Sequence, residues 1–418
     1  MLTAAGAGRQ RILFLTPQLP YPPEQGTAIR NYNLLRQVAS RHEVALLSFD
    51  SREGDGLRDH ASQVGPLSAF CRPLRVIPVP RRSPADRLST LLTSSLPDMA
   101  FRLYAPAFVQ ALREIVSQER YDIVQIEGIE LARYGLLLRE WLGAAAPRVI
   151  LDEHNAEYLL QRRAFERDLA HPGRWPAALY SLVQWFRLAH FERRACRAAT
   201  AVAACSEADA RALQALVPGL EVLVVPNGVD TERYQPGIPD SLPLQHPAIV
   251  FTGKMDFRPN VDGVLWFYER VWPTVRATVR DVRLYVVGQS PHQRLDPLRA
   301  DPQVTITGYV PDILPYFGGA DVYIVPLRIG GGTRLKVLEA MSSGLPIVST
   351  TLGAEGIDLT PGQHALLADE PEAFARAVLL VLQDRDRAHL GLAASQRARE
   401  LYDWRSIALR LEGLYQPS

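Results

Sequence analysis

A glycine run followed by basic and acidic residues is the segment of this chain best suited to chemistry, and it lies between Arg328 and Thr350. The glycines at 330 to 332 let the backbone approach a ligand closely, and Thr333 can cap the helix that the following periodicity predicts. The free amide groups and the dipole of a helix N-terminus attract phosphate. The segment therefore predicts a binding site for a phosphate or diphosphate group.

Two basic side chains, Arg334 and Lys336, fall in the first turn of that predicted helix. Positive charge is unfavourable at this end of a helix unless an anion is bound nearby, so their position favours a diphosphate ligand. Glu339 follows Lys336 by three positions. From spacing alone, these two residues could equally form an ordinary surface ion pair.

Two further segments in the second half place glycine and polar residues at the ends of predicted strands. Gly253 and Lys254 end a strand over 248–253, and Tyr309 ends a strand over 304–309. Ligands bind at the carboxyl ends of strands in open α/β sheets, which makes the segment at Gly253 and Lys254 a candidate binding site. Packing in the core is an equally good interpretation of Tyr309.

The first half offers two weaker signals. His154 follows a predicted strand over 148–152 and has polar neighbours, but a lone histidine is usually structural. The loop after the first strand carries Gly26 and Thr27 directly before a predicted helix, which is a second amide-rich anion site or simply a long proline-rich turn.

The elements that must position these residues are short apolar runs alternating with helical patterns along most of the chain. Helical stretches between most of the runs are long enough for parallel crossovers. Each half therefore reads as a doubly wound parallel sheet of the Rossmann-like kind. Strands are predicted over 11–15, 43–49, 75–79, 122–126, 148–152, 201–205 and 221–226, and then over 248–253, 283–288, 304–309, 322–327, 345–350 and 364–368.

A proline-rich stretch without periodicity, residues 234–247, separates the two alternations and suits an interdomain linker. We therefore predict an N-terminal domain over 1–233 and a second domain over 248–390. The helices over 391–418 are predicted to pack back towards the N-terminal domain.

The composition excludes several classes of protein. The 418 residues include 46 basic and 45 acidic residues, so no overall charge recruits nucleic acid or anionic lipid. Three cysteines at spacings that match neither a disulfide framework nor a zinc site suit a reducing cytosol. The N-terminus does not resemble a signal peptide, and no apolar run is long enough to span a membrane. We expect a cytoplasmic protein, with peripheral contact at the inner face of the cell membrane as the alternative.

One long helical pattern, Trp175 to Arg197, bears on that alternative. Its apolar residues at 179, 182, 183, 186 and 189 fall on one stripe, which predicts a core-facing helix. Contact of this stripe with a membrane-borne acceptor lipid is the second interpretation.

The glycine-run segment resembles the donor-site signature of retaining family 4 glycosyltransferases, which have the GT-B fold of two Rossmann-like domains facing a cleft. The motif VVPNGVD at 224–230 resembles the interdomain hinge of that family. The resemblance implies catalytic roles for His154, Lys254, Arg334 and Lys336. It implies donor-binding roles for Gly26, Gly253, Tyr309, Val310, Gly331, Gly332, Thr333, Leu335 and Glu339.

Individual roles follow from the same resemblance. Glu339 would bind the ribose hydroxyls of the donor, and the loop at Tyr309 would hold the nucleobase through backbone groups. Lys254, with Arg334 and Lys336, would neutralise the diphosphate, over which Gly26 would close. His154 would reach the donor sugar and help to stabilise the transition state, and Arg30 or its neighbours would face the acceptor.

The chain departs from the family pattern at two positions. Gly331 stands where the family usually has a glutamate that contacts the donor sugar, so sugar recognition falls to backbone amides or to other residues. Pro259 stands where the family commonly has a lysine, and we expect Lys336, Arg334 or Arg258 to supply the missing charge.

The resemblance implies a hexosyltransferase that moves a sugar from a UDP or GDP sugar to a glycan, glycolipid or small-molecule acceptor, with retention at the anomeric carbon. Neither a DXD motif nor a carboxylate cluster in the sequence argues for a bound metal, and no cofactor besides the nucleotide sugar is expected. Two alternatives stay open, a sugar-nucleotide 2-epimerase on the same scaffold and a non-catalytic nucleotide-sugar-binding protein.

Overall fold

The computed structural model describes residues 8–50, 64–238, 242–330, 334–383 and 388–416. The chain forms two compact units, one comprising Met1–Pro226 with Ile407–Ser418 and the other comprising Asn227–Ser406. The first unit thus ends before residue 233, the predicted boundary, and the chain rejoins this unit only at Ile407.

The first unit is built on a seven-stranded parallel sheet with the order β3-β2-β1-β4-β5-β6-β7. The chain enters at the centre and winds outwards in both directions, as predicted. Strand β1 is fully buried from Ile12 to Leu15, as expected for a parallel strand covered on both faces. The strands are β1 Arg11–Thr16, β2 Glu43–Asp50, β3 Cys71–Pro78, β4 Ile123–Glu127, β5 Arg148–Glu153, β6 Ala201–Ala204 and β7 Val222–Val224.

The helices of the first unit connect these strands as crossovers, and two of them form a long antiparallel hairpin. They are α1 Gly26–Ala39, α3 Pro84–Thr93, α4 Met99–Arg102, α5 Pro106–Gln118, α6 Ala132–Leu142, α7 Glu157–Leu169, α8 Trp175–Ala198 and α9 Glu207–Leu216. Helix α16, Trp404–Glu412, begins in the second unit and ends in the first.

The second unit repeats the same winding in a six-stranded parallel sheet with the order β10-β9-β8-β11-β12-β13. All five residues of β8 are buried. The strands are β8 Ala248–Thr252, β9 Arg283–Val287, β10 Val304–Ile306, β11 Val322–Val325, β12 Ile347–Ser349 and β13 Leu366–Leu367. The helices are α10 Arg258–Trp266, α11 Trp272–Thr278, α12 Leu314–Gly318, α13 Leu335–Ser342, α14 Pro371–Gln383 and α15 Ala388–Tyr402. Every predicted strand is therefore present.

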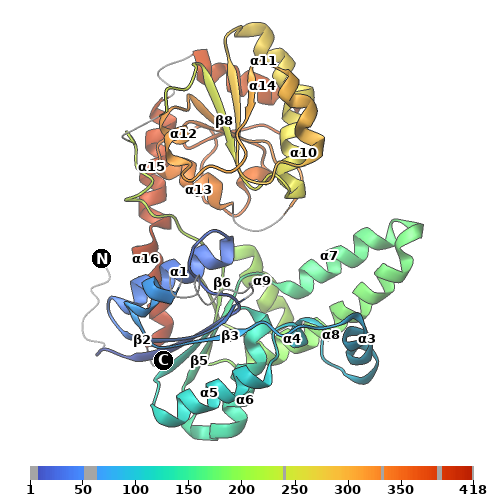
Figure 1. The fold of residues 1–418 in the computed structure, drawn as a ribbon, viewed down its shortest axis with the longest axis vertical. Coiled ribbons are helices and arrows are strands. Elements are labelled where there is room, and N and C mark those ends of the chain that lie inside the picture. Colours follow the sequence, from blue (N-terminus) through green and yellow to red (C-terminus); the bar gives the residue numbers. More distant parts are fainter. Residues whose placement is uncertain (1–7, 51–63, 239–241, 331–333, 384–387, 417–418) are drawn as a thin grey trace. The chain divides into compact units, whose positions relative to one another are not determined.

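Helices α7 and α8 pack against each other along the hairpin that extends from the first sheet (Figure 1). Phe165 of α7 stacks on Trp185 of α8 with ring centroids 6.1 Å apart. At the base, the Glu192 carboxylate accepts hydrogen bonds from the backbone N–H groups of Glu157 and Tyr158, both 3.0 Å away. It thereby satisfies two free amides of the first turn of α7. Burial raises the pKa of Glu192 to about 8.

The prediction that the whole stripe on α8 faces the core is wrong, although Ala189 at its end packs against the core. Leu179 is 64% exposed and Phe186 is 63% exposed. The helix instead buries its opposite face, which includes the polar residues Ser181, Gln184 and Glu192. Among the helices that the structure describes, none is long and apolar enough to cross a membrane.

Candidate functional site

The carboxyl edge of the second sheet is shaped by glycines that follow its first strands. Gly253 follows β8 and Gly288 follows β9, both with positive φ angles, 156° and 149°. A Cβ atom on Gly288 would lie 1.7 Å from the carbonyl oxygen of Gly253, and a Cβ on Gly253 would lie 2.6 Å from Lys336 Nζ. Only glycine permits this close approach, so the sheet edge brings bare backbone next to an ammonium group.

Lys336 reaches this edge from the first turn of α13. Its Nζ donates hydrogen bonds to the carbonyl oxygen of Thr252 at 2.7 Å and to Asn260 Oδ1 at 2.8 Å. The ammonium also lies 4.3 Å from the centroid of the Phe251 ring. Burial lowers the pKa of Lys336 to about 7, against the opposing charge of Glu339. The group is thus held where an added anion would favour its charged form.

Lys336 contacts the residue that follows Pro259. Asn260, the next residue, accepts from Lys336 Nζ and donates its amide N–H to the carbonyl oxygen of Lys254 at 2.8 Å. The ammonium from α13 therefore lies beside the start of α10, where the resemblance expects a lysine. That Lys336 supplies this charge to a ligand stays a prediction.

Lys254 itself points into solvent. Its side chain is 55% exposed, and Nζ lies 3.4 Å from Asp256 Oδ2. An exposed pair of this kind is weak and readily exchanged, so the ammonium can turn to another anion at the same edge.

Arg334 precedes the helix and does not lie within its first turn, because α13 begins at Leu335. The residue is 8% exposed, and burial lowers its pKa while the charge of Glu355 acts in the opposite direction. Its guanidinium lies against Gly330, where a Cβ atom would come 3.2 Å from Nη1. The predicted donor-binding residues Gly331, Gly332 and Thr333 lie outside the described residues.

Glu339 lies one turn after Lys336, but the described hydrogen bonds of Lys336 go to Thr252 and Asn260. The carboxylate accepts a hydrogen bond from the Tyr234 hydroxyl at 3.3 Å. Burial raises the pKa of Glu339, and the Tyr234 hydrogen bond and the charge of Lys336 oppose the rise. The alternative that Lys336 and Glu339 form a surface ion pair is therefore not what the structure shows.

Tyr309 and Val310 follow β10, and their side chains lie in different environments. The Tyr309 side chain is 71% exposed, which rules out core packing, whereas Val310 packs against the core of the unit. Gly308, just before them, has a φ angle of 72° and turns the chain at this edge. Tyr309 thus presents an uncovered aromatic ring at the edge where Gly253 and Lys336 lie.

The carboxyl edge of the first sheet carries a different set of groups. His154 follows β5, and its Nε2 lies 3.0 Å from Oε2 of Glu127, the last residue of β4. Glu127 is fully buried, and its other oxygen accepts a hydrogen bond from Gln125 at 3.1 Å. Burial alone would lower the pKa of His154, but the hydrogen bond and charge of Glu127 raise it above its ordinary value. Glu127 is not among the residues predicted from the sequence, although a carboxylate that ends a buried strand is a usable signal.

Arg30 and Asp152 form a buried ion pair next to this histidine. Arg30 Nη2 lies 2.7 Å from Asp152 Oδ2, Arg30 Nε lies 3.1 Å from the same oxygen, and Arg30 is 2% exposed. Arg30 also donates to the carbonyl oxygen of Pro226 at 3.1 Å. The expectation that Arg30 faces an acceptor is therefore wrong, because its guanidinium neutralises an interior carboxylate. Gly26, by contrast, lies exposed at the start of α1.

The fold also assembles a carboxylate cluster that the sequence did not suggest. Glu127 pairs with Asp152 across β4 and β5, so the ligand atoms of Glu127, Asp152 and His154 lie within 4.8 Å of one another. Such a group could hold a metal ion. Two nitrogens of Arg30 already bind the Asp152 carboxylate, however, and their positive charge opposes a second cation. We therefore interpret the cluster as an internally neutralised network.

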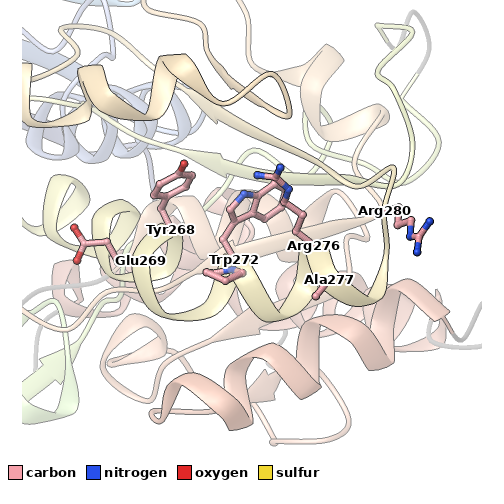
Figure 2. A pocket seen from close by; sticks show the side chains of 7 residues that line it. Tyr268, Glu269, Trp272, Arg276, Ala277 and Arg280 are labelled. Carbon is pink, nitrogen blue, oxygen red and sulfur yellow. The ribbon is translucent and has the colours of Figure 1, made fainter.

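One hollow of about 580 Å³ lies elsewhere in the second unit (Figure 2). The Trp272 indole and the Arg276 guanidinium beside it both donate hydrogen bonds to Asp301, at 3.2 and 3.0 Å. None of the predicted site residues is part of this hollow. Its lining comprises Tyr268, Glu269, Trp272, Pro273, Arg276, Ala277 and Arg280.

Both units match known families of domains. Residues 25–228 match the family described as Glycosyl transferase 4-like domain, and residues 246–384 match the family described as Glycosyl transferases group 1.

Curated relatives match over part of their length. A phosphatidyl-myo-inositol mannosyltransferase of Mycobacterium tuberculosis is 28% identical over 221 residues, which cover 50% of this chain and 57% of that protein. An uncharacterized 44.6 kDa protein in the cps region of Klebsiella pneumoniae is 22% identical over 161 residues, or 34% of this chain and 42% of that protein. The alignments thus span about half of the length of these relatives.

Solved structures match along almost the whole chain. A sucrose-phosphate synthase from Thermosynechococcus elongatus superposes with a TM-score of 0.69 at 19% identity, covering 97% of this chain and 98% of that chain. Anabaena Alr3699/HepE, solved in complex with UDP and glucose, superposes with a TM-score of 0.62 at 16% identity, covering 97% of this chain and 99% of that chain. At these identities, the likeness concerns the fold.

Proposed function

We propose that this chain, which belongs to the group 1 glycosyltransferases and has their GT-B fold, transfers a hexose from a nucleoside diphosphate sugar to an acceptor hydroxyl. UDP and GDP sugars are the proposed donors, and a glycan, a glycolipid or a small molecule is the proposed acceptor. The placement of Lys336 carries the proposal.

Lys336 combines three properties that suit a diphosphate. Its ammonium lies at the carboxyl end of β8, next to Gly253, and its described hydrogen-bond partners are a neutral carbonyl and a neutral amide. No carboxylate among the described residues accepts a hydrogen bond from this ammonium, and burial lowers its pKa despite the charge of Glu339, so an anionic guest would favour its charged form. Lys254 and Arg334 lie in the segments that flank this position and would add charge to the same guest.

Glu339 and Tyr309 complete the proposed nucleotide site. The Glu339 carboxylate, held by the Tyr234 hydroxyl, would accept hydrogen bonds from the ribose hydroxyls. The backbone at Tyr309 and Val310 would hold the nucleobase. The binding of UDP by Anabaena Alr3699/HepE and the mannosyltransferase name of the mycobacterial relative support a nucleoside diphosphate sugar as donor.

The proposed reaction proceeds with retention and without a metal. Departure of the nucleoside diphosphate places negative charge on its β-phosphate, which Lys336, Lys254 and Arg334 would stabilise as the glycosidic bond breaks. His154, held through Nε2 by Glu127, would position the donor sugar with its other ring nitrogen. The acceptor hydroxyl would attack the same face of the sugar from which the diphosphate leaves, and its proton would pass to the departing β-phosphate oxygen.

The test is a thermal-shift screen of the protein with UDP, GDP, ADP, CMP and their common sugar conjugates, because ligands that bind the folded state raise its stability. We expect a shift with UDP or GDP and their sugars. Glu339→Ala should weaken that nucleotide about 10-fold to 100-fold, the usual cost of losing hydrogen bonds to a charged group. Glu370→Ala, which removes an exposed carboxylate of the same unit, is the matched control. Equal affinity of Glu339→Ala and wild type would refute the site.

Incubation with the donor that binds then distinguishes the alternatives. A transferase forms a glycosylated product when acceptors are added, whereas a 2-epimerase converts the donor without any acceptor. Donor binding without either reaction would mark a binding protein. Asp152 speaks against the epimerase, because its carboxylate is bound by Arg30 and is not free to move a proton.

A further inference from the structure

In its first half, helix α8 exposes large apolar side chains and buries small or polar ones. Trp175, Leu179 and Phe186 are spaced by four and seven positions, so they share one face, and they are 59%, 64% and 63% exposed. The opposite face buries Ser181 and Gln184 in the protein interior. We call the three exposed residues the apolar stripe.

The hairpin that carries the apolar stripe is basic. Residues 160–187 contain five arginines and two acidic residues, a formal charge of +3, whereas the whole chain carries +1. Arg162, Arg163, Arg167 and Arg174 are exposed on α7 and in the turn that leads to α8. Arg162, Arg167 and Arg174 lie at ion-pair distance from Glu166 or Asp168, and the hairpin that carries the apolar stripe keeps a net positive charge.

The tip of the hairpin consists of exposed residues. Every residue from Leu169 to Ala177 is exposed, including the tryptophan that begins α8. The hairpin is nevertheless a defined structure, because α7 packs along α8 and Glu192 holds the first turn of α7. The apolar stripe is thus held on a fixed support.

This combination fits the surface of an anionic bilayer. Apolar side chains with a tryptophan among them enter the boundary between headgroups and acyl chains, while arginines remain with the phosphates. Basic residues near an anionic leaflet add attraction that falls off within a Debye length. A contact between two copies of this chain would bring two arginine-rich surfaces together. Their repulsion favours an anionic bilayer as the partner.

We propose that the apolar stripe on α8 and the arginines around it form a docking surface for an anionic lipid bilayer. Trp175, Leu179 and Phe186 would insert at the headgroup boundary, and Arg163 would contact lipid phosphates. The surface concerns the first unit alone and does not depend on sugar transfer.

The test is co-sedimentation of the whole chain with vesicles of phosphatidylcholine, with and without phosphatidylglycerol. We expect binding to the anionic vesicles that weakens as salt is raised. Leu179→Ser/Phe186→Ser should reduce the affinity at least about tenfold, because each buried apolar side chain of this size typically contributes that much. Arg163→Glu should reduce the affinity for anionic vesicles about fivefold or more and leave the weak binding to neutral vesicles unchanged.

The matched control is Leu392→Ser, which removes a leucine that is 59% exposed on α15 of the second unit and should bind as wild type does. Thermal unfolding and UDP affinity of each variant show whether it is folded. Absence of binding to anionic vesicles, or unchanged binding by Leu179→Ser/Phe186→Ser, overturns the proposal. Self-association of the wild type that this double variant abolishes in sedimentation velocity also overturns it, because the apolar stripe would then join two copies.

Discussion

The strands follow the same order in the two sheets, yet the charged groups at the two carboxyl edges have different kinds of partner. In the first unit Arg30 and His154 each have a carboxylate at hydrogen-bond distance, Asp152 for the arginine and Glu127 for the histidine. In the second unit the Lys336 ammonium is held by a carbonyl and an amide oxygen. The shared winding determines where polar groups gather, and the residue types decide whether that edge is neutral by itself or receptive to an anion.

The same contrast explains the direction of the pKa changes. Glu127 raises the pKa of His154, whereas burial lowers the pKa of Lys336 to about 7. A group whose charge is already compensated stays charged without a ligand. A group that has no carboxylate at hydrogen-bond distance gains more from a bound anion, which is why we propose the diphosphate site in the second unit.

The largest expected effect tests the carboxyl edge of the first sheet, where Arg30 and Asp152 form a buried ion pair. Arg30→Met leaves the Asp152 carboxylate buried without its partner and should lower the free energy of unfolding of the first unit by about 3–5 kcal/mol. Arg36→Met, an exposed position on the same helix, should cost no more than about 0.5 kcal/mol. Chemical denaturation measures both values.

The double variant Arg30→Met/Asp152→Asn removes the unpaired charge and should recover much of the lost stability. If it is as unstable as Arg30→Met, the ion pair is not the reason for the loss. A cost below about 1 kcal/mol for Arg30→Met alone would show that the two edges do not differ as we describe.

The second prediction concerns Glu127 and rests on the proposed transfer reaction. Glu127→Gln keeps the shape of the side chain but removes the charge that raises the pKa of His154. We expect kcat to fall about 10-fold to 100-fold, the range typical for a positioning group of the reacting assembly, with little change in the KM for the donor. The kcat profile against pH should also shift to lower pH, because His154 then loses its proton more easily.

Glu140→Gln, an exposed carboxylate on α6, is the control and should match wild type in kcat and KM. A purely structural role for Glu127 would lower stability without moving the pH profile. That outcome would remove His154 and Glu127 from the reaction.

The smallest expected effect concerns the carboxyl edge of the second sheet, where the charge of Lys336 depends on pH. Lys336, with a pKa of about 7, loses its charge as pH rises above 7, so UDP affinity should fall between pH 7 and pH 8.5, by at most about tenfold per pH unit. This window lies above the titration of a terminal phosphate, near 6 in phosphorylated side chains. Calorimetry measures the affinity, with uridine as the ligand without phosphate.

Lys336→Met should bind UDP more weakly at pH 7 and show no fall up to pH 8.5, while uridine binds both proteins alike. A UDP affinity that falls equally in wild type and Lys336→Met would assign the titration to another group. The contrast between the two edges would then lose its central residue.

The sequence was sufficient to predict the winding of both sheets, because strands that are buried on both faces must be apolar along their length, as in β1 and β8. It also located Lys336, since basic residues at a helix start conflict with the local dipole. What the sequence could not show were pairings between distant residues. Glu127 meets His154 only because β4 and β5 are neighbours, and Arg30 meets Asp152 across 122 positions.

Helix α8 shows a second limit of prediction from the sequence. Periodicity correctly grouped Leu179 with Phe186, but it does not say which side of a helix faces the protein. Here the buried side takes polar residues with interior partners, as when Gln184 accepts from the backbone N–H of Asp98 at 2.7 Å. A hydrophobic stripe therefore identifies a face, and only tertiary contacts identify what lies against it.

The hairpin of α7 and α8 extends far from the first sheet. The 24 residues of α8, at 1.5 Å each, extend about 36 Å, and the part from Trp175 to Phe186 accounts for about 16 Å of that length. Any surface that binds the apolar stripe is thereby held at a fixed distance from the sheet edge where His154 lies. The hairpin would act as a spacer, setting how far an acceptor must protrude from such a surface to reach the histidine.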